Sequence, residues 1–183
     1  FGLFYRMGLL KEMQYEYIGF IRKNDVHYSD VTKRIPLPDE SVDVVYSSHM
    51  IEHFTQLQLS RYLLEVKRVL KPGGIVRTAF PDISIHISQY VNDGDADAFL
   101  KRTRLMQVRD KMKTLCGRIQ ILFGYPDHKW MYDGKSFSEV LEKAGFSSPK
   151  VLLSGETTIA NPGELNLRQR ESESAYVEAV KCV

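Results

Sequence analysis

The sequence predicts an α/β fold, a three-layer sandwich around a mostly parallel sheet that ends in an antiparallel pair of strands. The first observation is a strand–helix–strand unit, in which a helix joins the strand-like segments Val42–Ser47 and Ile75–Phe80. Such crossovers are right-handed and make the two strands parallel. The second observation is that only a polar loop joins the last two strand-like segments, Lys150–Ser154 and Ala175–Lys181. A connection without a crossover helix predicts antiparallel strands.

The N-terminal part leads into the first long strand. Residues 4–14 have a weak helical pattern, and Val26–Asp30 read as a short strand that we expect to run parallel to the next two. Pro36 and Pro38 mark a loop, because proline has no N–H to donate to a central ladder. Val42–Ser47 is almost continuously apolar, which is typical of a parallel strand buried on both faces.

A helix follows this strand. Thr55 is suited to cap its N-terminus, and an apolar stripe runs along one face at helical spacing. The Lys71–Gly74 turn ends the helix, since proline cannot extend it and glycine accepts a left-handed conformation. The stripe consists of Leu59, Leu63, Val66 and Leu70.

The second half of the chain is more helical. A helical insertion is predicted over about 83–124, with a break at Asn92–Gly94. Phe137–Ala144 reads as the last helix, and Gly145 stops it. The chain contains no internal repeat and no linker-like segment, so we expect a single domain over residues 1–183.

Composition sets limits on the function. The 183 residues are 43% hydrophobic and 26% charged, and a formal net charge of +2 gives no electrostatic argument for nucleic-acid binding. No apolar run approaches the ~20 residues of a membrane span. Cys116 and Cys182 match no metal or redox spacing and suit a reducing cytoplasm. We therefore expect a cytoplasmic protein with no nucleic-acid partner and no transmembrane segment.

Two long segments together carry a family resemblance. Residues 29–54 read SDVTKRIPLPDESVDVVYSSHMIEHF, and residues 63–82 read LLEVKRVLKPGGIVRTAFPD. In this order they resemble the middle of a class I S-adenosylmethionine-dependent methyltransferase. More narrowly, they are similar to the small predicted methyltransferases of the type-11-like group, often found in polysaccharide-biosynthesis clusters. The resemblance implies a Rossmann-like fold and S-adenosylmethionine as cofactor. It also implies O- or N-methylation of a small molecule or sugar.

The resemblance assigns cofactor contacts at strand ends, where doubly wound sheets bind their ligands. It implies that Asp30 accepts a hydrogen bond from the adenine amino group and that the Val31 backbone meets the ring. Ser47, Ser48 and His49 end the next strand and are candidates to contact the methionine portion, chiefly through their backbone. Alternatively, Asp30 is a loop or capping residue, and the strand simply ends in small polar residues.

The family's first cofactor elements are missing from the sequence. A complete domain carries a glycine-rich turn after its first strand and an acidic residue after its second. Neither stands before Asp30, and the chain begins at Phe1. We therefore expect a fragment of a longer gene product, or a sheet whose first strands are rearranged. On this view the 183 residues alone bind S-adenosylmethionine weakly or not at all.

The histidines supply candidate catalytic residues. His49 to His53 fit the H-x-x-E-H pattern of inverted zinc proteases, which requires a continuous helix through both histidines and a third ligand from a later helix. A buried strand runs directly into His49, so we expect no metal. In a methyltransferase, His49 or His53 suits the removal of a proton from the acceptor. Alternatively, Glu52 and His53 cap or orient the following helix.

A second candidate site lies after the helical insertion. His128 is a candidate base, with Asp127 or Asp133 to orient its ring, and Trp130 and Tyr132 are candidates to bind the acceptor. The alternative is an aromatic anchor that holds the insertion against the core. The basic stretch from Lys101 to Arg118 suits a solvated helix face or an anionic acceptor.

Three functional hypotheses remain open. The favoured one is methyl transfer from S-adenosylmethionine to a small-molecule or sugar acceptor. The second is a non-catalytic remnant that acts as an interaction module through an exposed sheet edge. The third is a zinc hydrolase. The sequence leaves a homodimer open as well.

Overall fold

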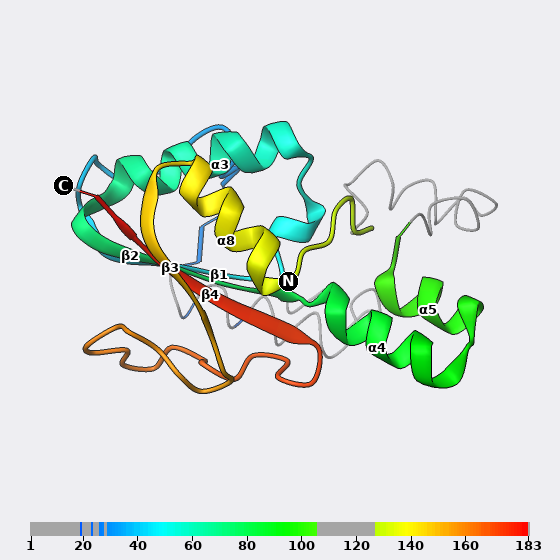
Figure 1. Cartoon of the computed structure of the whole chain (residues 1–183). Helices are drawn as coiled ribbons and strands as arrows, with labels where there is room; N and C mark the ends of the chain where they lie inside the picture. Colours follow the sequence, from blue (N-terminus) through cyan, green and yellow to red (C-terminus); the bar gives the residue numbers. More distant parts are fainter. Residues whose placement is uncertain (1–18, 20–22, 24–25, 28, 106–126, 183) are drawn as a thin grey trace. The chain divides into compact units, whose positions relative to one another are not determined.

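The computed structural model describes residues 19, 23, 26–27, 29–105 and 127–182 of the chain (Figure 1). Val31–Val183 form one compact unit, and the residues before Val31 belong to another, so each is described by itself. The elements of the larger unit are β1 (Val42–Ser48), η1 (Ile51–His53), α3 (Gln56–Val69), β2 (Leu70–Pro81), α4 (Ile83–Asp93), α5 (Ala96–Thr103), α8 (Gly134–Lys143), β3 (Phe146–Leu152) and β4 (Ser174–Lys181).

These strands form a four-stranded mixed sheet in the order β1-β2-β4-β3. β1 runs parallel to β2, with Val45 opposite Val76 and Ser48 opposite Ala79. β4 lies between β2 and β3 and is antiparallel to both. The predicted α/β class, the parallel unit and the antiparallel C-terminal pair are therefore confirmed. Among the described strands the sheet is mixed rather than mostly parallel, because β4 lies antiparallel between β2 and β3.

The predicted strand at Val26–Asp30 is wrong. The described residues Val26, His27, Ser29 and Asp30 are outside any strand. Val26 is 46% exposed and none of these four residues is buried, so they lack the burial of a parallel strand. The predicted helix at 4–14 lies outside the described residues.

Local signals position α3 and α8 as expected. Thr55 caps α3 through a capping box, accepting from the Gln58 N–H at 3.3 Å while Gln58 Oε1 accepts from the Thr55 N–H at 2.9 Å. α8 begins with a similar box at Asp133 and Ser136. Gly145, just after α8, has a φ of +83°, a conformation that favours glycine. The two capping boxes provide partners for backbone N–H groups at the helix N-termini, which have no partner inside the helix.

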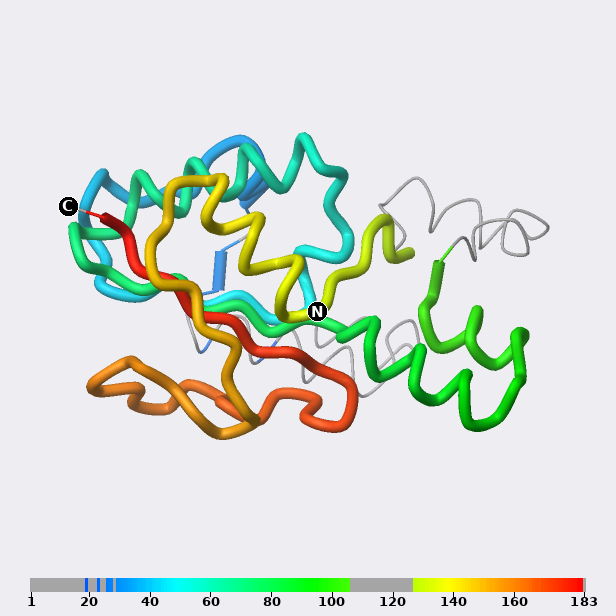
Figure 2. The backbone as a smooth tube through the Cα atoms, viewed as in Figure 1, coloured from blue at the N-terminus to red at the C-terminus, as the bar shows by residue number. Residues whose placement is uncertain are grey.

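The two faces of the sheet are covered differently, as the ribbon and the tube show (Figures 1 and 2). α3 and α8 cover one face, where Phe80, Phe137 and Leu141 belong to the apolar core. On the other face lies the polar loop 153–173, which follows β3 and leads into β4. The phenol of Tyr46, on β1, donates to the Asn166 carbonyl of this loop at 3.0 Å.

A buried ion pair fastens this loop to the sheet. Arg77 on β2 and Glu178 on β4 are 0% and 2% exposed, and their charged groups approach to 2.5 Å. Arg77 also donates to the carbonyls of Glu156 and Leu167 in the loop. Burial opposes ionisation of Glu178, but hydrogen bonds from threonines of the loop outweigh it and lower the pKa of the carboxyl group.

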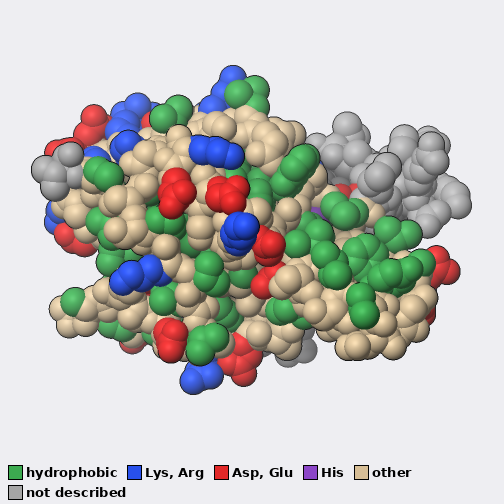
Figure 3. Space-filling model, in the orientation of Figure 1, with side chains coloured by type: hydrophobic (Ala, Val, Ile, Leu, Met, Phe, Trp, Pro, Cys, Tyr) green, Lys and Arg blue, Asp and Glu red, His purple; other side chains and the backbone are tan. Residues whose placement is uncertain are grey.

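The α4–α5 hairpin follows β2, within the predicted insertion. The predicted break is confirmed, because Gly94 ends α4 in a left-handed conformation. Hydrophobic side chains gather on the surface over α4 (Figure 3). Among the residues that the structure describes, no helix has the length and apolar character that crossing a lipid bilayer requires. The exposed apolar residues of the hairpin are Ile87, Tyr90, Val91 and Leu100.

Candidate functional site

The carboxyl ends of β1 and β2 lie next to each other, because the two strands are parallel and adjacent. His49, directly after β1, donates its backbone N–H to the Ala79 carbonyl on β2 at 2.9 Å. In sheets of this type ligands bind at such strand ends, where the loops offer unpaired polar groups. This edge is therefore where the predicted site residues can meet.

The serines at the end of β1 differ in their bonding. Ser47 donates to the hydroxyl of Thr78 at 3.3 Å and also hydrogen-bonds to the phenol of Tyr62. The hydroxyl of Ser48 is buried and has no hydrogen-bond partner. A buried hydroxyl without a partner is costly, so Ser48 is suited to meet a polar ligand atom at this strand end.

His49 is held in an unusual backbone conformation. Its φ is +48°, in the left-handed region that few residues other than glycine adopt. The ring is fixed at both nitrogens: Nε2 lies 2.9 Å from the hydroxyl of Ser174, and Nδ1 lies 3.4 Å from the guanidinium of Arg170. Such strain, with a ring fixed by its neighbours, is typical of functional sites.

Glu52 lies at the centre of the histidine cluster. It sits in the short helix η1, and its side chain is 2% exposed. Its Oε1 is 3.5 Å from Nδ1 of His49 and 3.9 Å from Nε2 of His53, while its buried Oε2 has no hydrogen-bond partner. Its backbone carbonyl accepts from the N–H groups of Lys129 and Trp130, which ties η1 to the segment after the insertion.

His53 and His128 face each other across this junction. Their ring centroids are 5.2 Å apart in an edge-on arrangement. Nδ1 of His53 hydrogen-bonds to the Asp127 carbonyl at 3.2 Å. The ring of His128 hydrogen-bonds to the backbone of Thr103, and its Nδ1 is buried without a partner. Burial lowers the pKa of His128, partly opposed by the charge of Glu52, so the ring favours its neutral form.

The structure thus brings three predicted catalytic residues, His49, His53 and His128, around one carboxylate. Glu52 itself was not predicted as a site residue. Of the alternative for Glu52 and His53, the capping role is wrong, because Thr55 caps α3. A role in orienting this helix stays a prediction. The continuous helix of the zinc-protease motif is also not formed, since η1 is a three-residue 3₁₀ turn that begins after His49.

The two aromatic residues predicted to bind an acceptor differ in exposure. Trp130 is 50% exposed. Tyr132 is 4% exposed and packs against Phe80 and Phe137 in the core, with its hydroxyl accepting from Gln56. Tyr132 therefore anchors this segment to the sheet, and acceptor binding by either residue stays a prediction.

Of the two carboxylates predicted to orient His128, Asp133 has another role. Its Oδ1 accepts from the Ser136 N–H at 2.6 Å and caps α8. Asp127 is 9% exposed, and its Oδ2 has no partner. Asp127 thus adds one more buried, unpartnered oxygen next to His128.

The two residues predicted to contact adenine belong to different units of the chain. Asp30 is exposed and belongs to the first unit, whereas Val31 is half-buried and begins the second. Val31 packs against the apolar core of its own unit. The adenine contacts of both residues remain predictions.

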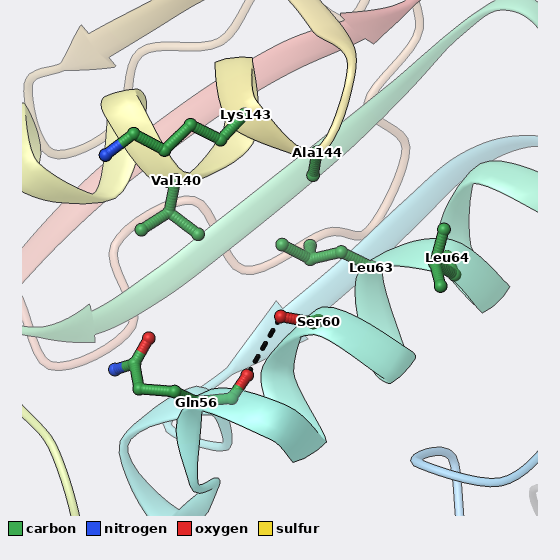
Figure 4. A pocket seen from close by; sticks show the side chains of 7 residues that line it. All are labelled: Gln56, Ser60, Leu63, Leu64, Val140, Lys143 and Ala144. Atoms are coloured by element: carbon green, nitrogen blue, oxygen red, sulfur yellow. Dashed lines mark hydrogen bonds between the residues drawn. The ribbon is translucent and has the colours of Figure 1, made fainter.

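A groove between α3 and α8 is separate from these residues (Figure 4). It has a volume of about 390 Å³, and none of the predicted site residues lines it. Leu63, Val140 and Ala144 give it aliphatic walls, and the hydroxyl of Ser60 is already bonded to the Gln56 carbonyl at 3.0 Å. Without converging unpartnered polar groups, this groove lacks the features of a reaction site.

Residues 11–78 match the family model of a methyltransferase domain. The match includes β1, the histidine-bearing turn after it, α3 and most of β2. It therefore covers most of the residues on which the resemblance in the sequence was based, and the resemblance to a methyltransferase domain is confirmed over this part of the chain.

Solved structures similar to this chain include a SAM-dependent methyltransferase from Thermotoga maritima. It is 19% identical, with a TM-score of 0.48 and coverage of 93% of this chain and 69% of that one. A SAM-dependent methyltransferase from Archaeoglobus fulgidus is 16% identical, with a TM-score of 0.45 and coverage of 85% and 66%. A Haloferax volcanii protein solved with the Trm112 methyltransferase activator is 15% identical, with a TM-score of 0.45 and coverage of 83% and 59%. The chain thus spans less than two thirds of the last two proteins.

Proposed function

We propose that this chain is part of a class I methyltransferase domain and that it serves methyl transfer from S-adenosylmethionine to a small-molecule or sugar acceptor. The observation that carries the proposal is the cluster of His49, Glu52, His53 and His128 beside the carboxyl ends of β1 and β2. The family match over residues 11–78 supports the choice of methyl donor.

The end of β1 fits a bound cofactor. The buried hydroxyl of Ser48 lacks a partner, and a ligand atom at this strand end would satisfy it. When bound, S-adenosylmethionine supplies an activated methyl group. We assign Ser47, Ser48 and His49 to its methionine portion and Asp30 and Val31 to its adenine.

The chain's own residues would position the acceptor and take up its proton. His49 is fixed by Ser174, and His53 by the Asp127 carbonyl, so their rings are oriented before any ligand arrives. Orientation in advance is a large part of what an enzyme contributes to a displacement reaction. Trp130, half exposed beside this cluster in the chain, is suited to stack on a sugar ring.

The test is transfer of a labelled methyl group. The full-length product of the gene, incubated with labelled S-adenosylmethionine and a panel of sugar nucleotides and small hydroxyl or amine compounds, should label at least one acceptor. Glu52→Gln should abolish most of this labelling. If wild type and Glu52→Gln label the acceptor equally, the cluster is not required for the reaction.

The alternative role as an interaction module has one observation in its favour. Among the described strands, β1 pairs only with β2, so its other edge has no strand partner there. An open edge can accept a strand from another chain, including a second copy. Sedimentation of the protein at several concentrations tests this role, because a self-pairing edge predicts concentration-dependent dimers.

A further inference from the structure

We infer that Glu52, His53 and His128 form a binding site for a divalent transition-metal ion such as Zn²⁺. A carboxylate oxygen and one nitrogen of each ring lie within 4.8 Å of one another. Donor atoms bound to one zinc ion at about 2.0–2.2 Å lie about 3–4 Å apart, so side-chain movements below about 1 Å close the site. From the sequence we expected no metal, because the zinc-protease motif requires a continuous helix through both of its histidines. The three residues proposed here come from two separate parts of the chain and do not require that helix.

The bonding of His53 shows which nitrogen is available. A carbonyl oxygen can only accept, so Nδ1 of His53 must carry the proton that it shares with the Asp127 carbonyl. In the neutral ring Nε2 then carries a lone pair, and this atom lies 3.9 Å from Oε1 of Glu52. A lone pair and a carboxylate oxygen repel each other unless a cation or a proton lies between them.

His128 has the same arrangement. Its ring hydrogen-bonds to the backbone of Thr103, whereas Nδ1 is buried and unpartnered. Both rings are therefore held through one nitrogen by the backbone and leave the other nitrogen free. Metal-binding histidines are oriented in this way, because a backbone carbonyl that accepts the second ring N–H fixes the ring and its tautomer.

The carboxylate supplies the third argument. Glu52 is 2% exposed and Oε2 has no hydrogen-bond partner. A carboxylate buried in this state is unfavourable unless it is paired or coordinates a metal. The two nearby imidazoles approach Oε1 only to 3.5 and 3.9 Å, longer than the ~2.7–2.9 Å of a charge-assisted hydrogen bond.

The donor set selects the kind of ion. Two imidazoles and one carboxylate are typical ligands of zinc and related transition metals, whereas Mg²⁺ prefers oxygen ligands alone. Three protein ligands leave at least one coordination position for water or a ligand oxygen. Asp127, whose Oδ2 is buried and unpartnered beside His128, is suited to hydrogen-bond to such a water.

The test is calorimetric titration of Zn²⁺ into the 183-residue chain, prepared without a histidine tag and stripped with a chelator. Wild type should bind one Zn²⁺ per chain. Glu52→Gln and His128→Asn should each weaken binding at least ~100-fold, since loss of supporting residues alone costs ~10–100-fold. Mg²⁺ titrated in the same way should bind far more weakly than Zn²⁺.

The matched control is His86→Asn. His86, on α4, is also a buried histidine with an unpartnered Nδ1, but it lies outside the cluster. It should bind Zn²⁺ like wild type. Circular dichroism of the metal-free proteins shows which variants fold, and either cluster variant alone is sufficient for the comparison.

Two results would overturn the proposal. One is a wild-type chain that binds no Zn²⁺, which would leave Glu52 and the histidines as an ion-pair cluster. The other is a folded Glu52→Gln or His128→Asn variant that binds Zn²⁺ as tightly as wild type, which would place any metal elsewhere. No methyl donor enters this assay, so its outcome is independent of the proposed methyl transfer.

Discussion

At the scale of single residues, the cluster around Glu52 combines features that do not favour folding. His49 has a left-handed backbone, and Glu52, Ser48 and His128 bury polar atoms without partners. Each such feature costs about 1–3 kcal/mol. Residues that disfavour folding in this way and lie together at a strand end are expected where a protein binds a ligand.

His128 is expected to affect turnover more than stability. His128→Ala should lower methyl transfer by ~10²–10⁴-fold, the loss typical of removing a group that handles a proton or orients it. The unfolding free energy should fall by no more than about 1–2 kcal/mol, because the deleted ring includes an unpartnered buried nitrogen. Labelled-methyl transfer and thermal melting of the same preparations measure the two quantities.

His86→Ala provides the comparison at another buried histidine. It should retain turnover close to wild type, whatever its melting temperature. If His128→Ala instead kept full turnover and melted many degrees lower, His128 would be a structural anchor of the segment after the insertion. His49→Ala and His53→Ala tested in parallel show whether another ring carries the activity.

At this scale the sequence predicted the three histidines as site residues but not Glu52, the carboxylate between them. The H-x-x-E-H pattern contains Glu52, but in that pattern both histidines lie on one continuous α-helix, and η1 is not an α-helix. Pairing of His53 with His128 depends on how the chain returns after the insertion, which no local pattern contains. Tyr132 was predicted either to bind the acceptor or to be part of an aromatic anchor, and it lies in the core because its ring packs against Phe80.

At the scale of elements, the Arg77–Glu178 pair joins β2, β4 and the loop 153–173. Arg77→Met should lower the unfolding free energy by about 3–5 kcal/mol, because it leaves a buried carboxylate without its positive partner. The double variant Arg77→Met/Glu178→Met should recover much of that loss, since an apolar pair of similar volume avoids the buried charge. Urea denaturation of the three proteins measures both effects. A double variant less stable than Arg77→Met would contradict this account.

A second ionic contact holds the loop before β1 onto α3. Glu65 accepts from Arg68 and from the Ile35 N–H, and chiefly the Arg68 hydrogen bond lowers its pKa to about 2. A carboxyl group whose pKa is lowered by folding stabilises the folded state at pH values above its ordinary pKa. This contribution to stability is lost as the pH falls toward about 2. Hydrogen exchange at the Ile35 amide should therefore remain protected at pH 5 and lose protection below about pH 3.

The control for this contact is Arg68→Ala. The variant removes the guanidinium that also donates to Asp39 and to the Ile35 and Leu37 carbonyls. Protection at Ile35 should then begin to fall nearer the ordinary carboxyl pKa. An unchanged pH dependence in Arg68→Ala would show that the Arg68–Glu65 bond does not set it.

Elements with both a periodic pattern and an end signal were the predictable ones. α3 has its apolar stripe and its Thr55 cap, but the glycine stop predicted at Lys71–Gly74 is wrong, because the helix already ends at Val69 and these residues belong to β2. β1 and β2 contain the long apolar runs that predicted them. Val26–Asp30 has a short pattern without an end signal, and the predicted strand is wrong. β3 (Phe146–Leu152) also begins earlier than the strand predicted at Lys150–Ser154. Its pairing with β4 continues through an irregularity near Pro149, which periodicity does not reveal.

At the scale of the whole molecule, the parallel β1–β2 pair determines where the chemistry can take place. Two adjacent parallel strands end at one edge, and the segment that follows the insertion returns to this edge through the backbone bonds between Glu52 and Lys129 and Trp130. The sheet topology therefore assembles residues from distant parts of the sequence. This arrangement and the methyltransferase-domain match lead to the same proposed reaction.

The central claim is that S-adenosylmethionine is the ligand of this site, and calorimetric titration of S-adenosylmethionine into the full-length product of the gene tests it most directly. The account predicts saturable one-to-one binding with a Kd of roughly micromolar order, about −8 kcal/mol. Mutating Ser48 to Val, which removes the unpartnered hydroxyl at the end of β1, should weaken it. A folded full-length protein that shows no binding of S-adenosylmethionine would contradict the account.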